Sequence, residues 1–170
     1  MSIRSCPAPL NFSPVGDLAW VKPLPYKPSF IKRRKPKGRK AQGVRYEKRA
    51  HEHFNELFGD RYINSQWFQF KEPDTKTRYC EIDGLLIRPK QGTIIILEMK
   101  YNHTSDAWWQ TRRLYEPIIK FLFPEQLWEV AICEVVKWFD PATKFPEDLQ
   151  MVKDIRDVQT GKFGLHIWKP

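Results

Sequence analysis

Three charged residues near the middle of the chain have the types and spacing of a metal-dependent hydrolytic site. Asp83 lies in an alternating run at residues 79–87, and Glu98 and Lys100 directly follow an apolar run at residues 93–97. Because Glu98 and Lys100 are two residues apart on an extended chain, their side chains leave the same face. Opposite charges at the end of a buried strand need each other, a cation or an opening to water. We therefore expect them to form a pair at the end of a central strand.

Asp83 can complete this site across a β-hairpin, since only a short turn separates its run from the apolar one. Two neighbouring carboxylates resist ionising until a divalent cation lies between them. Mg²⁺ suits a site with so few protein ligands, because waters and substrate phosphate oxygens complete its coordination, and Mn²⁺ is a substitute. Lys100 would then orient or help deprotonate an attacking water, or neutralise charge on the phosphate.

The pattern of Asp83, 14 intervening residues and Glu98-Met99-Lys100 resembles the signature of the PD-(D/E)XK nuclease superfamily, whose fold is restriction-endonuclease-like. Ile82 stands where the family's name residue is proline. The resemblance implies that Asp83, Glu98 and the backbone carbonyl of Met99 coordinate Mg²⁺, with Lys100 as the catalytic lysine. The alternative is a surface Glu and Lys on a frayed strand end, so the motif needs its structural setting.

The elements expected around the hairpin follow the order of that superfamily's core: helix, three strands, helix, strand. Apolar residues at helical spacing predict a helix over residues 43–58 that Gly59 ends. The aromatic-rich residues 62–71 predict a strand ahead of the hairpin. The fold class expected is α/β with a restriction-endonuclease-like core.

The second half of the chain completes this order. A helix capped by Thr104 or Ser105 is expected after the Glu-x-Lys strand, with a kink or a split at Pro117. Residues 127–138 predict a further strand at the spacing of a crossover connection. Residues 152–168 predict a terminal hairpin around Thr160-Gly161.

Two further residues are candidates through the same resemblance. Archaeal Holliday-junction resolvases and RecB-type nucleases carry a glutamate on a first helix that points at the metal, and Glu47 looks similar; alternatively it complements Lys40 and Lys48 on a wet face. RecB-type nucleases also carry a Gln-x-x-x-Tyr motif on the later helix. Here Gln110 and Tyr115 have one residue too many between them, so only Gln110 is carried over.

The charge of the chain is concentrated in one segment. The 170 residues suit one domain, and the net charge of +9 with a pI of about 9.5 favours an anionic partner such as DNA. Seven of the nine residues at 32–40 are basic, so the remainder carries 9 − 7 = +2. The first 40 residues also hold seven of the 14 prolines, a density that prevents regular helix and interior strand. We expect an extended, Pro-rich and basic arm at residues 1–40, lying partly along the domain or a second subunit, and a nuclease-like domain at residues 41–170.

Basic residues of the arm and of the second helix are the expected contacts to the nucleic-acid backbone. The alternatives are a solubilising or targeting tail and two solvated arginines. The expected contacts are Lys32, Arg33, Arg34, Lys35, Lys37, Arg39 and Lys40 in the arm, and Arg112 and Arg113 in the helix.

Several classes of protein do not fit the sequence. Three cysteines without close spacing predict neither a disulfide framework nor a zinc site and favour a reducing, cytoplasmic location. No apolar run approaches the length of a membrane span, and no signal-like apolar segment follows Met1. A phosphate-cradling GxxxxGK[ST] loop is absent, so no nucleotide cofactor is expected.

The function that the resemblance implies is Mg²⁺-dependent hydrolysis of phosphodiester bonds in DNA, by an endonuclease in preference to an exonuclease. Junction or branched DNA is one substrate class found among the similar nucleases, and many of them act as homodimers. The alternatives are a non-catalytic nucleic-acid-binding or assembly protein that keeps a nuclease-like core, and a scaffold whose arm binds another protein. The sequence leaves the form of the nucleic acid open, RNA included.

Overall fold

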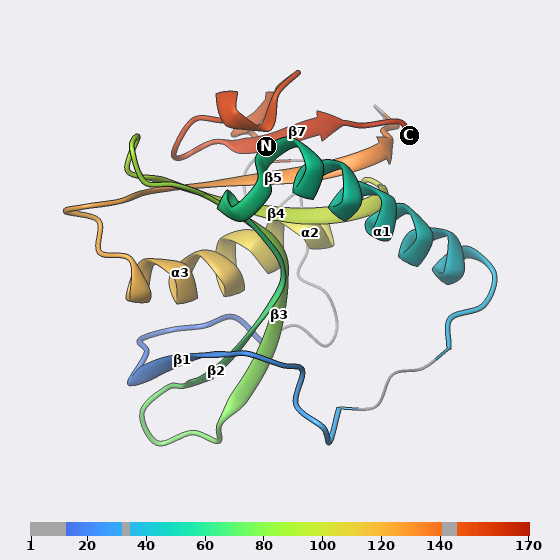
Figure 1. Ribbon diagram of the computed structural model, residues 1–170. Coiled ribbons are helices and arrows are strands. Elements are labelled where there is room, and N and C mark those ends of the chain that lie inside the picture. The colour runs from blue at the N-terminus through green and yellow to red at the C-terminus, as the bar shows by residue number, and fades with distance from the viewer. Residues whose placement is uncertain (1–12, 32–34, 141–145) are drawn as a thin grey trace.

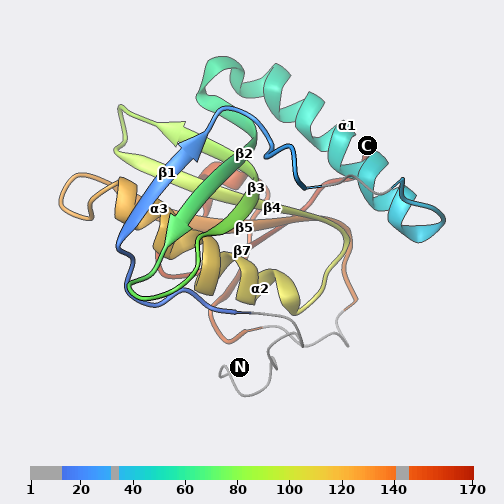
Figure 2. The same cartoon turned by 90° about the horizontal axis from the view of Figure 1, so that it is seen from below.

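A seven-stranded mixed sheet with helices on both faces forms the protein. The computed structural model describes residues 13–31, 35–140 and 146–170, and the strand order is β1-β2-β3-β4-β5-β7-β6. Helix α1 covers one face of the sheet, while α2 and α3 cover the other (Figures 1 and 2). The strands are β1 (Trp20–Leu24), β2 (Tyr62–Lys71), β3 (Arg78–Arg88), β4 (Thr93–Asn102), β5 (Glu129–Trp138), β6 (Leu149–Met151) and β7 (Phe163–Ile167). The helices are α1 (Arg39–Phe58), α2 (Asp106–Gln110) and α3 (Glu116–Leu122), with short helical segments η2 (Gly59–Arg61), η3 (Thr111–Tyr115) and η4 (Ile155–Asp157).

Strand β4 is the central strand, as its apolar pattern predicts. Residues 94–97 are fully buried. Alternate side chains of this run enter two separate core clusters, one containing Ile118 of α3 and the other Phe54 of α1. A strand covered on both faces needs apolar residues at both parities, which explains the uninterrupted Ile-rich run.

The predicted three-strand segment and crossover are confirmed. Strands β2, β3 and β4 are antiparallel neighbours, and β5 returns parallel to β4 after the α2–α3 helix. The strand predicted over residues 62–71 coincides with β2, and the predicted first helix coincides with α1 except that α1 begins earlier, at Arg39. Arg39 and Lys40, which the sequence assigned to the arm, therefore belong to the first turn of a helix.

The second helix is split close to Pro117. The N–H of Glu116 bonds to the carbonyl of Thr111, five residues earlier, so η3 is a π-helical segment between α2 and α3. Proline has no N–H to offer the carbonyl four residues before it, that of Arg113. That carbonyl instead accepts a hydrogen bond from the N–H of Val15 at 2.9 Å, which ties the described part of the N-terminal arm to the irregular turn.

The described part of the N-terminal arm contributes an edge strand. Strand β1 pairs antiparallel with β2 and lies at the end of the strand order. Pro23 fits there because an edge strand has one side without a ladder. Residues 1–12 and 32–34, and with them Lys32, Arg33 and Arg34, lie outside the described residues.

The predicted terminal hairpin is wrong. Strands β6 and β7 are parallel neighbours, with η4 in the connection between them, and a two-residue turn can join only antiparallel strands. The connection crosses the α1 side of the sheet, where Ile155 and Val158 are buried in the α1-side core cluster. Gly164 permits this packing, since a Cβ there would lie 2.4 Å from a Val158 methyl carbon. Within the described residues, no helix has the length and apolar character needed to cross a membrane.

Gly84 gives a direct test of the packing around β3. A Cβ on Gly84 would lie 2.6 Å from the Tyr62 hydroxyl, whose oxygen is 2.6 Å from Nδ1 of His51. We expect Gly84→Ala to lower the free energy of unfolding by about 1–3 kcal/mol, the usual cost of overpacking, as measured by urea denaturation. Gly43→Ala in α1 is the matched control: its Cβ would contact nothing within 4 Å, so the substitution should be neutral or stabilising. Equal effects at the two positions would contradict this account.

Candidate metal centre

Strands β3 and β4 separate at the residues singled out by the sequence. Their ladder runs from Arg88 opposite Thr93 to Gly84 opposite Leu97 and ends there. Beyond that point β3 pairs only with β2, and β4 only with β5. The next residues along the two strands are Asp83 and Glu98. The hairpin therefore opens into a fork at these two carboxylates, and β3 curves away from β4 in Figure 1.

The backbone of β2 is irregular at the same level. Ser65 has a φ of 55°, and its neighbours Asn64 and Gln66 face Gly84 and Ile82, so Ser65 stands opposite Asp83. A non-glycine residue in the left-handed region costs free energy and persists only where its surroundings impose it. The bend of β2 and β3 at the fork is thus built into the sheet.

Asp83 occupies the opening of the fork. Its Oδ2 accepts a hydrogen bond of 2.8 Å from the N–H of Met99, a group that β3 no longer pairs. The N–H and C=O of a strand residue point to the same side. The carbonyl of Met99, an implied metal ligand, therefore faces the opening as well.

Glu98 and Lys100 form the predicted pair. The Nζ of Lys100 lies 2.8 Å from Oε1 of Glu98, and Glu98 is only 2% exposed. Its other oxygen, Oε2, is buried and receives no hydrogen bond from a described N–H or O–H group. Asp83 bonds to the backbone of Met99, the residue after Glu98, so its carboxyl lies near that of Glu98. An orphaned carboxylate oxygen next to a second carboxyl fits a site for a hard cation.

Burial and like charge control the ionisation of these groups. Burial, followed by the charges of Glu98 and Glu47, raises the pKa of Asp83 well above its usual range. Burial also raises the pKa of Glu98, and Lys100 opposes that rise. For Lys100, burial alone would lower the pKa, but Glu98, Asp83 and Glu134 raise it to about 12. Lys100 is therefore an ammonium at neutral pH, and burial makes both carboxyls harder to ionise than exposed ones.

Two more carboxylates reach Asp83. Glu47 from α1, Glu81 and Asp83 each place a carboxylate oxygen within 4.8 Å of the others. Glu47 was a candidate from the sequence, and its carboxylate lies near that of Asp83. Glu81 was not a candidate, although the alternation of β3 puts Glu81 and Asp83 on one face. The donors around the fork are all oxygens, which is the ligand set that Mg²⁺ and Mn²⁺ prefer.

Tyr115 is a second residue that sequence reasoning missed. Burial is the main cause of its raised pKa, and the charges of Glu98 and Asp83 also raise it. The π turn of η3 takes one residue more than an α turn. The extra residue between Gln110 and Tyr115 is thereby absorbed, and the two share a helix face as residues four apart do in an α-helix. Gln110 has a buried Oε1 that accepts no hydrogen bond from the part of the chain that the structure describes.

Glu134 extends the acidic cluster onto β5. It stands directly beside Glu98 in the parallel ladder, and its Oε2 lies 2.7 Å from Nδ1 of His103, with both side chains fully buried. Burial raises the pKa of Glu134, and the contact with His103 opposes that rise. A glutamate inside the otherwise apolar strand at residues 130–136 was the available sequence signal.

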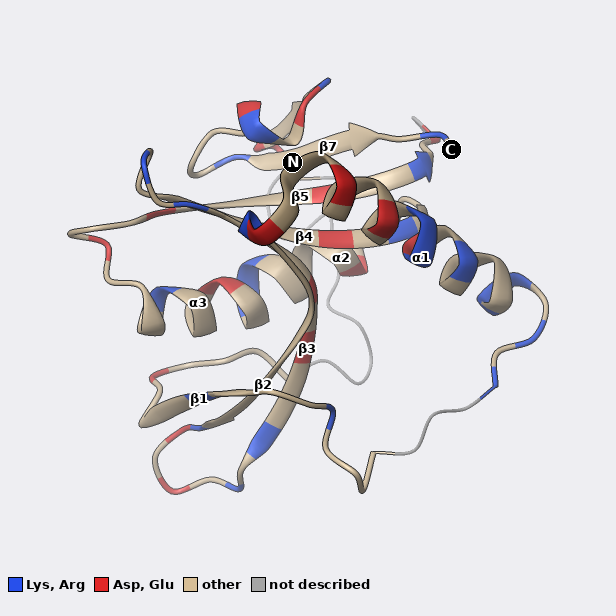
Figure 3. Ribbon diagram, viewed as in Figure 1, with Lys and Arg blue, Asp and Glu red and all other residues tan. Residues whose placement is uncertain are grey.

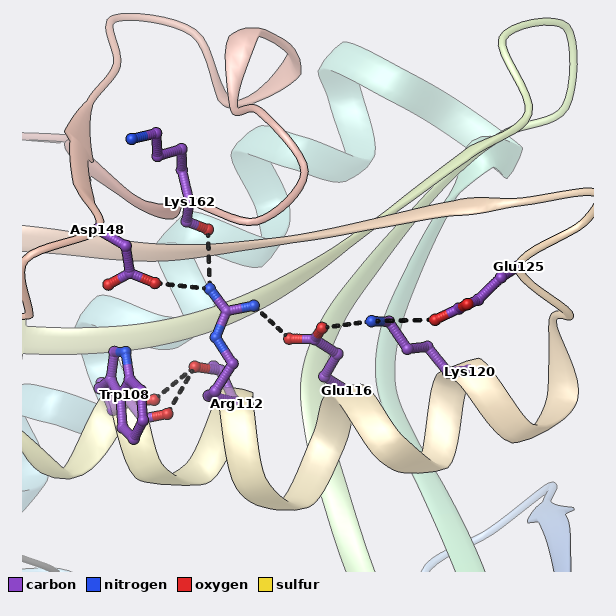
Figure 4. A network of polar contacts seen from close by, with 9 residues as sticks. Trp108, Arg112, Glu116, Lys120, Glu125, Asp148 and Lys162 are labelled. Carbon is purple, nitrogen blue, oxygen red and sulfur yellow. Dashed lines mark hydrogen bonds and ion pairs between the residues drawn. The ribbon is translucent and has the colours of Figure 1, made fainter. Parts of the chain in front are cut away.

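The two arginines predicted to contact phosphate have different surroundings. Arg112 lies 2.6 Å from Glu116 and 2.9 Å from Asp148, and it also donates to the carbonyl of Lys162 at 3.3 Å (Figure 4). Its charge is used to hold the helix to the segment before β6. Arg113 is exposed, with its guanidinium carbon 5.8 Å from the centre of the Trp108 ring. Of the arm residues within the described part of the chain, Lys35, Lys37, Arg39 and Lys40 are all exposed.

The chain matches no family model, and searches of curated proteins and of solved structures found no similar protein. The class of protein is therefore defined by the fold and the site alone. It is a mixed α/β protein with an acidic cluster, able to hold a metal ion, at a fork in its central sheet.

Proposed function

We propose that this protein is a metal-dependent nuclease of the PD-(D/E)XK superfamily that hydrolyses phosphodiester bonds in DNA. One observation carries the proposal: Asp83, Glu98 and Lys100 meet where β3 and β4 diverge, with Lys100 2.8 Å from Glu98 and Asp83 bonded to the backbone of Met99. The order of α1, then β2, β3 and β4, then α2–α3 and β5 supports it, because that order is the one the family resemblance implies.

Asp83, Glu98 and the carbonyl of Met99 would hold Mg²⁺ or Mn²⁺, with Glu47 and Glu81 beside them. When bound, such an ion polarises a phosphoryl oxygen and lowers the pKa of a coordinated water. The protein groups give the rest of the site. Three or more clustered carboxylates attract the ion but repel the phosphate, so a cation is needed on the substrate side.

Lys100 supplies that cation. As an ammonium beside Glu98 it can neutralise charge on the phosphate or orient the attacking water. Tyr115 and Gln110 close the site on the side of the α2–α3 helix. Tyr115 brings a hydroxyl donor whose pKa the charges of Glu98 and Asp83 raise, and Gln110 brings an acceptor that no described group satisfies.

The proposed contacts to the DNA backbone are the exposed basic residues of the arm and of the first turn of α1, together with Arg113. Arg112 is left out, because two carboxylates already bind it. Endonuclease action on junctions or branched DNA, by a homodimer, is the form of the activity that the family resemblance favours.

Incubation of the whole protein with labelled junction, flap, duplex and single-stranded DNA, each with Mg²⁺, Mn²⁺ or EDTA, tests the proposal. We expect cleavage of at least one substrate with either ion and none with EDTA. Binding without cleavage in every metal condition would instead support a non-catalytic nucleic-acid-binding protein. A parallel panel of RNA substrates tests the choice of DNA, because only contacts to the 2′-hydroxyl distinguish the two backbones.

A further inference from the structure

A basic hollow lies between α1 and the ends of β4 and β5, on the α1 side of the sheet. Its volume is about 260 Å³, and its lining includes Gln42, Arg45 and Arg49 of α1, Tyr101 of β4 and Lys137 of β5. The helix residues are three, four and seven positions apart, so they share one face of α1. Figure 3 shows basic residues of α1, the end of β5 and the C-terminal segment gathered at this end of the sheet.

The charges in this hollow are unpaired. Within the described part of the chain no carboxylate lies within ion-pair distance of Arg45, Arg49 or Lys137, and Arg45 and Arg49 are exposed. Other arginines of the protein are used differently. Arg78, Arg112 and Arg156 each lie within 3.1 Å of a carboxylate oxygen. Three cationic side chains therefore line the hollow, together with Pro170, without an ion-pair partner among the described residues.

Lys137 is held in place without being neutralised. Its Nζ lies 5.4 Å from the centre of the Tyr101 ring and also 5.4 Å from that of Trp138. An aromatic face attracts a cation but leaves its charge and its N–H donors available. Lys137 shares the hollow with two arginines. A guanidinium group can bind phosphate through paired N–H donors, so this set of cations suits an anionic ligand.

The hollow adjoins the carboxylate site along two elements. Tyr46, which also lines it, precedes Glu47, and Tyr101 follows Lys100. A nucleic-acid strand that passes Glu47 and Lys100 therefore also passes the next residue of each element, and another of its phosphates can lie in the hollow. The volume is below the roughly 300–1,000 Å³ of typical small-molecule sites, which favours a phosphate over a whole nucleotide.

We propose that this hollow binds a phosphate of the substrate strand other than the one that is cleaved, through Arg45, Arg49 and Lys137. The inference rests on the proposed nuclease function for the identity of the ligand. Its contribution to binding does not depend on cleavage, because the three cations contact the nucleic acid and not the acidic cluster.

Fluorescence anisotropy in EDTA tests this subsite with labelled single-stranded DNA that carries a 5′-phosphate or a 5′-hydroxyl. We expect Arg45→Ala/Arg49→Ala to weaken binding at least about tenfold and to lower the slope of log K against log salt by up to about 0.7, the value for one phosphate contact on a single strand. Lys137→Ala should act in the same direction. Loss confined to the 5′-phosphorylated strand assigns the hollow to a terminal phosphate, and equal loss on both strands assigns it to an internal one. Inorganic phosphate should displace both labelled strands from the wild-type protein at the same concentration. It should not displace them from the double variant, and this result would support the same subsite.

The control is Lys90→Ala/Lys153→Ala, which removes two charges from exposed residues outside the hollow. Its binding should stay within about twofold of wild type, and the urea midpoints of both double variants should match that of wild type. Equal weakening by the two double variants, or no binding of either strand by wild type, would overturn the inference. Because EDTA prevents metal-dependent cleavage, a protein that binds in this way but never cleaves would refute the proposed enzyme and not the subsite.

Discussion

Lys100→Met is expected to lower the rate of DNA cleavage by at least about 10²- to 10³-fold, the usual cost of removing one group that stabilises developing charge. Methionine keeps most of the length of the side chain but removes the ammonium that lies 2.8 Å from Glu98. The site then presents only negative charge to the phosphate. Single-turnover cleavage of a labelled substrate in Mg²⁺ measures the effect.

Asp83→Asn should reduce cleavage to a similar degree, because an amide cannot contribute a negative charge to a metal site. Binding of DNA in EDTA should change little for both variants, since the proposed backbone contacts lie elsewhere. Lys90→Met, at an exposed position of the β3–β4 turn, is the control and should cleave at the wild-type rate. Full cleavage by both Asp83→Asn and Lys100→Met would end the nuclease hypothesis.

The stability of the metal-free protein is expected to fall as the pH rises from about 5 to 8. Asp83, Glu98 and Glu134 all have folded-state pKa values above their usual ones, whereas unfolded carboxyls titrate near 3.9–4.3. The folded state therefore binds more protons than the unfolded state above that range. The stabilisation that these carboxyls give the folded state is fully present below the pKa of the unfolded chain. It is lost as the pH rises through their folded-state pKa values. Lys100 adds nothing to this window, because its raised pKa is about 12.

Urea denaturation at several pH values, with and without Mg²⁺, measures this dependence. Mg²⁺ should restore stability at pH 8, by about 2.7 kcal/mol at 100 times its dissociation constant. Asp83→Asn should flatten the pH profile, raise the stability of the metal-free protein at pH 8 and weaken the response to Mg²⁺. Asp60→Asn, at an exposed position, should behave as wild type. A pH profile that is the same for wild type and Asp83→Asn would contradict this account of the acidic cluster.

Much of the sheet could be predicted because its pattern is local. The alternation in β3 predicts a strand with one buried face, and the apolar run in β4 predicts a strand with two. Strand periodicity also puts Glu98 and Lys100 on one face. The terminal segment was predicted wrongly because Thr160-Gly161 is a turn signal with a short range. Whether such a turn joins neighbouring strands or belongs to a crossover depends on where Ile155 and Val158 are buried.

The site residues that were not predicted depend on features that are irregular or that join distant parts of the chain. Tyr115 was set aside because helix spacing was taken as regular, and the π turn before Pro117 changes that spacing. Glu81 and Glu134 reach the cluster only through the bend of β3 and the parallel register of β4 with β5. Arg112 was counted among phosphate contacts because its partner Asp148 lies 36 residues away in the chain.

By itself, the sequence determined the central strand, the hairpin and the charged pair at its end, because residue period and burial are properties of adjacent positions. Only the tertiary structure decided that β3 leaves β4 at Asp83, that Glu47 and Glu134 approach from other elements, and that three cations line one hollow with no carboxylate partner among the described residues. These features arise from strand register, backbone bends and the packing of helices onto the sheet, which join residues far apart in the chain and have no local pattern.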